Sequence, residues 1–292
     1  MGLKISDLTQ DTTLAEGTLF EVSNAGYSRS ISAIDVLKYS ILDQIRGFSI
    51  SNNVSDANND IDITVGMCLD STREELIYNM TGSTLIKRLD ANWSVGTNAG
   101  GLDTGSKATS TVYYIYAIKK DADGSIDYLF SVNATTPTMP AGYTYKRLIG
   151  TCITDVSGNI LSGTWNRING NQISFVFSTP VASLAITTSA NNTRNTLALT
   201  VPSGNICEVF FNTHFNTQTG SANYGIVLSP YAADIAPLKS NANLGSDQNN
   251  DGRTGALVVT TDTSGNITYR IDQGGGVSIA VYLTLTRYIQ TL

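Results

Sequence analysis

Apolar and polar residues alternate one by one in short stretches over most of this chain, and that period of two constrains the fold more than any other feature. Ile61–Val65 places three apolar residues on one side of an extended segment, and Ile173–Phe177 repeats the pattern with isoleucine and phenylalanine. Successive side chains of a strand point to opposite faces, so each stretch fits a strand that is buried on one face. We therefore predict a mostly β chain.

Residues 169–292 carry this pattern most regularly. Further strand-length segments in this region are Leu197–Val201, Ile206–Phe211, Gly225–Leu228, Ala256–Thr260, Ile267–Ile271 and Val277–Thr286. Turn sequences such as Asp262–Asn266 separate them. Seven or eight short strands at this spacing predict a C-terminal antiparallel β-sandwich of jelly-roll-like type.

Residues 49–168 form a second β region. The run VYYIYAI is followed by two lysines, by the turn sequence Asp121–Gly124 and then by the apolar Ile126–Phe130, which is a hairpin signal. The string LIKRLDANWSVGTNAGGLDTGS at Leu85–Ser106 contains Trp93 and four glycines, and it departs from strand periodicity. We expect a central β module in which this string supplies a loop.

Residues 1–48 have a polar lead, a strand-like LFEVS and then a helix signal. Ser32 can accept the free amides of a helix that begins at Ala33, and Asp35 suits the positive helix end. The helix would run for about 14 residues, and Gly47 would end it. Its apolar stripe consists of Ile34, Leu37, Ile41 and Ile45, with Leu42 beside them. The stripe can pack on its own domain, on copies of the chain or on another protein.

The composition excludes some classes of partner. Charged residues make up 14% of the 292 residues and hydrophobic residues 41%, with a net charge of −6. Because nucleic acids and anionic membranes are captured by lysine and arginine, a nucleic-acid partner is not expected. No apolar run reaches the roughly 18 residues of a membrane span, and the first residues do not have the pattern of a secretory signal peptide. We expect no membrane insertion and no export by a signal peptide.

The three cysteines, Cys68, Cys152 and Cys207, are widely spaced and form no C-x-x-C motif. An odd number without metal or redox spacing favours buried, reduced thiols in a protein made in a reducing cytoplasm.

Catalytic chemistry has few candidate residues. His214 is the one histidine, and it lies in FFNTHFNTQTG, at the expected end of a strand and start of a polar loop, without a G-x-S-x-G elbow. A surface or subunit-interface histidine is the favoured interpretation. Two carboxylates at a fixed separation, placed across a subunit seam, could still hydrolyse a glycan.

Two acidic segments have part of a calcium-binding pattern. Asp121, Asp123 and Asp127 cluster at a hairpin tip, where Asp-Gly also serves as an ordinary turn. The loop Ser246–Gly252, which includes Asp247 and Asp251, places oxygen donors at alternate positions, but Val258 stands where a calcium loop has glutamate. We expect no metal at either segment and leave calcium at Asp247–Asp251 open.

The two tryptophans allow two interpretations. Trp93, beside Asp90 and Asn92, would stack on a sugar if its ring were exposed, or fill the core of the central module. Trp165, near the junction into the third region, is equally ambiguous.

The segments from Asn58 to Gly150, with LIKRLDANWSVGTNAGGLDTGS at their centre, resemble a module found in tail-fibre and other appendage proteins of tailed bacteriophages. The lead KISDL resembles their short N-terminal anchors, and the closing YLTLTRYI is similar to their distal β-sandwiches. The resemblance implies a virion structural protein, usually a homotrimer, assembled in the host cytoplasm.

We therefore expect a virion-anchoring segment at residues 1–48, a central module at 49–168 and a distal, receptor-facing sandwich at 169–292. The expected function is host attachment by a tail or head fibre, and the alternative is a capsid-decorating or tail-adaptor protein that binds only virion neighbours. The N-terminal segment would bind other virion proteins, and the sandwich a host glycan or protein. We predict no enzymatic activity and no catalytic, cofactor-binding or metal-binding residues.

Overall fold

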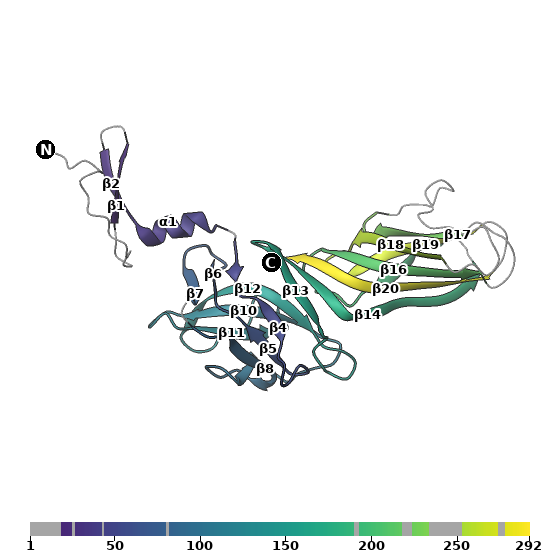
Figure 1. Cartoon of the computed structure of the whole chain (residues 1–292), viewed down its shortest axis with the longest axis horizontal. Helices are drawn as coiled ribbons and strands as arrows, with labels where there is room; N and C mark the ends of the chain where they lie inside the picture. Colours follow the sequence, from purple (N-terminus) through teal and green to yellow (C-terminus); the bar gives the residue numbers. More distant parts are fainter. Residues whose placement is uncertain are drawn as a thin grey trace.

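The computed structural model describes residues 19–24, 27–42, 44–79, 82–189, 193–217, 224–233, 253–273 and 278–292. These residues form strands and one helix, which confirms the prediction of a mostly β chain. Three parts follow one another along the long axis: an N-terminal arm, a central β unit and a C-terminal β-sandwich (Figure 1). The C-terminus returns to the middle of the molecule, where the two β units meet (Figure 1).

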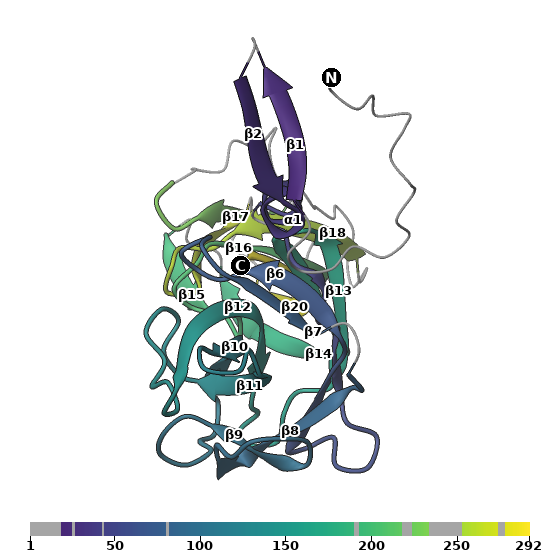
Figure 2. The same ribbon diagram turned by 90° about the vertical axis from the view of Figure 1, so that its left-hand side faces the viewer.

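The arm consists of a two-stranded hairpin and a short helix. Strands β1 (Leu19–Asn24) and β2 (Tyr27–Ser32) pair in antiparallel fashion, and α1 (Ala33–Ser40) follows β2 directly. Strand β2 was not predicted, because its Ser-Arg-Ser-Ile-Ser sequence has only one strongly apolar residue. The hairpin projects away from the rest of the molecule in both views (Figures 1 and 2).

The helix begins where the sequence predicts and ends earlier. Ser32 Oγ accepts the backbone N–H of Asp35 at 3.1 Å, which confirms the predicted N-cap. The expected length of about 14 residues is wrong, since α1 has eight residues and its C-cap is Ile41. Ile45 is buried but not helical, because its backbone N–H donates to Gly170 O at 2.6 Å. A tertiary hydrogen bond has replaced the last helical turns.

One face of α1 is covered and the other is not. Ile41 is buried with Leu69 and Leu76, and Ile34 and Leu37 pack against this cluster. The opposite side of the helix and the residues after it expose Val36 (45%), Tyr39 (71%) and Leu42 (46%). The arm therefore has a second apolar stripe that the described residues leave open to solvent.

The central unit contains two sheets. Its strands are β3 (Arg46–Gly47), β4 (Ile50–Asn52), β5 (Asp60–Ile63), β6 (Gly66–Leu69), β7 (Leu76–Asn79), β8 (Leu85–Asn92), β9 (Ala99–Leu102), β10 (Val112–Lys120), β11 (Ile126–Ser131) and β12 (Tyr143–Ile153). The larger sheet has the order β12-β10-β11-β9-β8-β5-β4, and the smaller one β3-β6-β7. Strand β9 pairs in parallel with both β8 and β11, and the other pairs of the larger sheet are antiparallel.

The predicted hairpin is confirmed as β10 paired with β11. Gly124 adopts a positive φ of 71° in its turn, a conformation that favours glycine. Strand β10 is buried on both faces and has no solvent-exposed face. Tyr113 and Ile115 belong to the main core, and Tyr114 and Tyr116 belong to a second cluster. This explains the unbroken apolar run VYYIYAI.

The C-terminal unit is an antiparallel β-sandwich. Its strands are β13 (Gly163–Asn169), β14 (Gln172–Ser189), β15 (Asn195–Ala198), β16 (Cys207–Thr217), β17 (Tyr224–Pro230), β18 (Arg253–Thr260), β19 (Asn266–Gln273) and β20 (Ser278–Thr291). A five-stranded sheet has the order β13-β14-β20-β16-β18, and a three-stranded sheet the order β15-β19-β17. Phe211 and Leu283 of the first sheet and Ile226 and Ile267 of the second share one buried core. Because each strand buries alternate residues, the sequence pattern identified this unit.

One continuous core joins the two β units. Trp165 is buried, and its indole Nε1 donates to Thr151 O of β12 at 2.8 Å. The Thr151 hydroxyl in turn donates to Gln290 Oε1 of β20 at 3.1 Å. Strand β13 spans the predicted boundary at residues 168 and 169, and it pairs with β14 of the sandwich. The units are therefore fused by side-chain packing and by buried hydrogen bonds.

In the parts of the chain that the structure describes, no helix has the length and apolar character needed to cross a membrane.

Candidate functional site

Trp93, which was a candidate for sugar stacking, lies in the loop after β8 and is half-buried. Its Nε1 donates to Tyr128 O at 3.1 Å, and its ring meets the ring of Tyr143 edge to face at 5.2 Å between centroids. The Nζ of Lys87 lies 5.4 Å from the centroid of the same ring. These contacts hold the indole within the central unit, as the core interpretation of Trp93 requires.

Lys87 organises this loop from a fully buried position. Its Nζ lies 3.0 Å from Asp127 Oδ1 and donates to Ser94 O at 2.7 Å and Gly96 O at 3.3 Å. The backbone N–H groups of Gly96 and Tyr128 donate to the Asp127 carboxylate at 2.9 and 2.7 Å. Burial lowers the pKa of Lys87, and the Asp127 carboxylate opposes that shift. The pair fixes the loop to the strand below it.

The acidic hairpin tip does not gather its three carboxylates. Asp127 is committed to Lys87, and Asp123 Oδ1 accepts the backbone N–H of Ser125 at 3.0 Å. Asp121 Oδ1 accepts the hydroxyl of Tyr145 at 3.3 Å. Among the described residues, no three His, Cys, Asp or Glu side chains are grouped so that they could hold a metal ion. The loop at Asp247–Asp251 lies outside the described residues.

The three thiols are buried and unpaired. Burial raises the pKa of Cys68, Cys152 and Cys207 to about 12 each. A thiol with such a pKa carries almost no thiolate at neutral pH and is a poor nucleophile.

His214 is placed differently from the expectation. Strand β16 continues to Thr217, so His214 lies within a strand and not at the start of a loop. The expectation failed because FFNTHFNT has polar residues at every second position after Phe211, which is also the pattern of a strand with one exposed face. The imidazole lies 5.8 Å from the ring of Tyr282 on β20, the register partner of His214.

A hollow of about 430 Å³ lies on the outer face of the five-stranded sheet, and Asn212, His214 and Thr284 line it. Asn212 pairs with Thr284 in the same way that His214 pairs with Tyr282. These four side chains are adjacent on the outer face, and we call them the outer quartet: Asn212, His214, Tyr282 and Thr284. Within the described part of the chain, none of the four donates or accepts a side-chain hydrogen bond. Four polar side chains at one place are thus free to bind something else.

Next to the outer quartet, Arg287 stacks on Phe210 with 3.7 Å between the guanidinium carbon and the ring centroid. This contact ties the Arg287 guanidinium to its own sheet.

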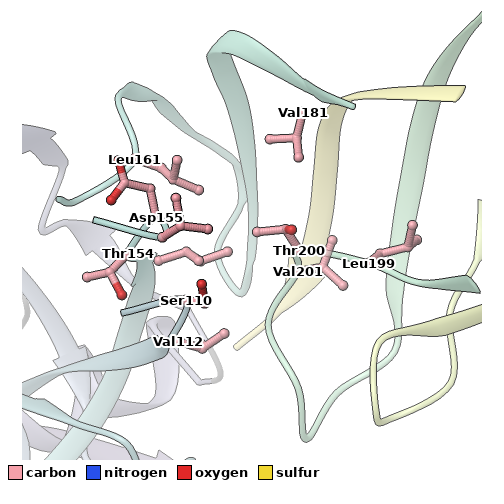
Figure 3. Close-up of a pocket in the computed structure, with 11 residues that line it drawn as sticks. Ser110, Val112, Thr154, Asp155, Leu161, Val181, Leu199, Thr200 and Val201 are labelled. Atoms are coloured by element: carbon pink, nitrogen blue, oxygen red, sulfur yellow. The ribbon is translucent and has the colours of Figure 1, made fainter. Parts of the chain in front are cut away.

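A second hollow of about 310 Å³ lies at the seam between the two β units. Figure 3 shows Leu161 and Thr154 on the side of the central unit, opposite Val181 and Val201 of the sandwich. The polar groups of its wall are mostly engaged. The Thr154 hydroxyl donates to Ala108 O at 2.8 Å, and Asp155 Oδ1 accepts the N–H groups of Ser157 and Asn159 at 2.8 Å each. The backbone hydrogen bond from Asn159 contributes most to lowering the pKa of Asp155. We therefore interpret the hollow at the seam as a packing gap. The Asp155 carboxylate at its edge stabilises a loop.

Sequence reasoning drew attention to Trp93, Asp127 and His214 but missed their partners Lys87 and Tyr282. Lys87 stands at an inward position of β8, where the alternation of LIKRLDAN would place an apolar residue. A lysine at a position where the strand pattern expects an apolar residue was the signal that could have indicated a buried ion pair. The sequence held no comparable signal for Tyr282, since tyrosines are common in the strands of this chain.

Comparisons with known proteins give no family. No family model matches the chain, and no curated protein matches it. Among solved structures, the infectious bursal disease virus Gx strain aligns with 97% of this chain and 72% of its own, at 10% identity and a TM-score of 0.24. A Bacillus thuringiensis Cry1Da tryptic core variant aligns with 83% of this chain and 51% of its own, at 7% identity and a TM-score of 0.17. Likenesses this weak carry no argument about fold or function.

Proposed function

We propose that this chain is a non-enzymatic structural protein of a tailed-bacteriophage virion, a fibre or appendage that attaches the particle to the host cell surface. The arm at residues 1–48 binds other virion proteins, and the sandwich at 169–292 faces the host. The sequence resemblance at Asn58–Gly150 motivates this assignment. The observation that carries it is the division of the molecule into an arm with an open apolar stripe at one end and a sandwich with free polar side chains at the other.

The arm supports an anchoring role because it is incompletely buried. A two-stranded hairpin and an eight-residue helix are marginal structures on their own. The exposed Val36, Tyr39 and Leu42 lie opposite the face of α1 that packs on Leu69 and Leu76. A helix that is apolar on two faces is normally covered on both. A virion neighbour that binds this stripe would complete the arm.

The fused β units support a role in transmitting force. Trp165, Thr151 and Gln290 link the units through buried hydrogen bonds, and apolar residues of both units form one core. A rigid body between an anchor and a binding surface suits an appendage. Homotrimer formation is part of the proposal, because three weak contacts on one particle become strong through effective concentration.

The second candidate is a capsid-decorating or adaptor protein that binds only virion neighbours. The same open apolar stripe on the arm favours this candidate. A virion protein can cover the stripe, and no contact with a host cell is needed for that.

Adsorption to host cells tests the leading proposal. Purified full-length chain labelled with a fluorophore should bind host cells and reduce phage adsorption when it is added first. A variant with Val36→Ser and Tyr39→Ser should still bind cells but should fail to enter particles. Cells that bind none of the labelled chain, together with virions that contain it, would support the decorating alternative instead.

A further inference from the structure

We propose that the outer quartet on the five-stranded sheet is a binding site for an uncharged glycan. This inference rests on the proposed function and deepens it, because it names the surface and the chemical class of the host receptor.

The placement of the quartet follows from strand register. Asn212 and His214 are two residues apart on β16, and their partners Thr284 and Tyr282 are two residues apart on β20. Adjacent strands lie about 4.8 Å apart, and residues two apart along a strand are separated by roughly 6.8 Å. The four side chains therefore stand at the corners of a small rectangle, a scale comparable with a sugar ring and its ring substituents.

The chemistry of the quartet suits sugar hydroxyls. The amide of Asn212, the hydroxyl of Thr284 and the imidazole of His214 each combine donor and acceptor capacity. Tyr282 is 42% exposed, so part of its side chain is open to a ligand. An aromatic ring supplies a flat apolar surface for the C–H face of a pyranose, while neighbouring polar groups select its hydroxyls. Because none of the described residues forms a hydrogen bond with these side chains, a ligand can bond to them without breaking a described hydrogen bond.

The residues around the quartet leave room for a ligand and favour an uncharged one. On the flanking strands, three of the four register neighbours of the quartet are alanines: Ala185 beside Tyr282, Ala182 beside Thr284 and Ala256 beside Asn212. The neighbour of His214 is Thr254. The three alanines are exposed and short, so no bulky side chain stands beside Tyr282, Thr284 or Asn212 at these positions. The guanidinium of Arg287 is stacked on Phe210. An acidic polysaccharide would find no free lysine or arginine within the quartet, and an uncharged glycan needs none.

A second copy of the chain is the competing occupant, because exposed alanines and a flat sheet also suit self-association. The two occupants make different demands. A subunit interface would tolerate apolar replacements, while a sugar site requires hydrogen-bonding groups in their places.

The test uses the full chain on an array of purified bacterial surface polysaccharides and of neutral glucose, galactose and mannose oligosaccharides, followed by titration calorimetry on the best neutral binder. The variants are Tyr282→Ala, His214→Ala and Asn212→Leu, with Tyr282→Phe as the conservative change. Tyr231→Ala is the matched control, since Tyr231 is 41% exposed and lies after β17, outside the quartet.

We expect the native chain to bind a neutral glycan. We expect affinity to fall by about tenfold for Tyr282→Ala, His214→Ala and Asn212→Leu, to fall less for Tyr282→Phe, and to be unchanged for Tyr231→Ala. Circular dichroism and the mass in solution should be the same for all variants.

Three results would overturn the inference. Glycan binding that survives all three disruptive variants would place the receptor site elsewhere. A change in oligomeric mass caused by these variants would make the face a subunit interface. Adsorption to host cells by a chain that binds no glycan on the array would refute the glycan site and leave host attachment standing, whereas failure to adsorb at all would refute the attachment function itself.

Discussion

The ammonium of Lys87 lies 3.0 Å from the carboxylate of Asp127, and the two side chains are 0% and 1% exposed. Lys87 comes from β8 and Asp127 from β11, and between them they bind the backbone of the loop at Ser94 and Gly96. A buried ion pair of this kind gains stability only because its remaining donors and acceptors are satisfied. The loop around Trp93 depends on it.

Replacement of Lys87 by methionine should destabilise the protein by about 3–5 kcal/mol, since it leaves the Asp127 carboxylate buried without its partner. Urea unfolding followed by tryptophan fluorescence measures this change. Arg88→Met is the matched control in the same strand, because Arg88 pairs with Asp90 at the surface, and it should change the unfolding midpoint little. The double variant Lys87→Met with Asp127→Leu should recover only part of the loss, because it removes the unpaired charge but leaves backbone groups at Ser94 and Gly96 without their partners. Equal effects of Lys87→Met and Arg88→Met would refute the role given to the buried pair.

The two β units should unfold together, because one apolar core spans them. The chain has two tryptophans, with Trp93 in the central unit and Trp165 at the seam. Trp165→Phe leaves Trp93 as reporter, and Trp93→Phe leaves Trp165. Each variant should show the same unfolding midpoint by fluorescence as by circular dichroism. Two separate transitions in either variant would mean that the units are independent domains.

Acid should weaken the protein in part through Asp70. Burial raises the pKa of this carboxyl, but hydrogen bonds from Glu75 N, the Thr72 hydroxyl, Thr72 N and Glu74 N outweigh burial and hold its pKa below 3.8. A folded-state pKa below the unfolded value means that this stabilisation is complete above pH 3.8 and is lost as the pH falls through the folded value.

Asp70→Asn should therefore cost about 1–3 kcal/mol at pH 7 and flatten the fall in stability below pH 4. Urea midpoints measured from pH 2.5 to 7 check this. If the variant loses stability below pH 4 as steeply as the native chain does, other carboxylates cause the acid sensitivity.

The arm should detach when the packing under α1 is weakened. Ile41 is 1% exposed against Leu69 and Leu76, whereas its neighbour Leu42 is 46% exposed. Ile41→Ala should raise amide hydrogen exchange in residues 33–40 by more than tenfold, because the lost contacts belong to a small cluster. Leu42→Ala should leave exchange unchanged. Similar exchange in the two variants would show that the helix does not depend on this contact.

The sequence predicted the sandwich well because its strands have one buried and one exposed face. Ile173, Phe175 and Phe177 alternate in the sequence and are all buried in the structure. The N-cap at Ser32 was equally predictable, since helix capping depends only on residues that are close together in the sequence.

The features that the sequence did not reveal depend on partners far along the chain. The helix ends early because Ile45 bonds to Gly170, and no local signal marks that contact. The outer quartet combines β16 with β20, whose register is set by the whole sheet. The parallel pairing of β9 with β8 and β11 also lies beyond hairpin rules, which describe antiparallel neighbours.

The location of the sandwich on intact particles tests the central claim most directly. Electron microscopy of virions from the source of this chain, decorated with Fab fragments raised against residues 169–292, should show label on projections that extend outward from the head or tail. Head or tail position would then distinguish the fibre types. Particles that bind no Fab, while the chain remains in the unassembled lysate fraction, would contradict the account.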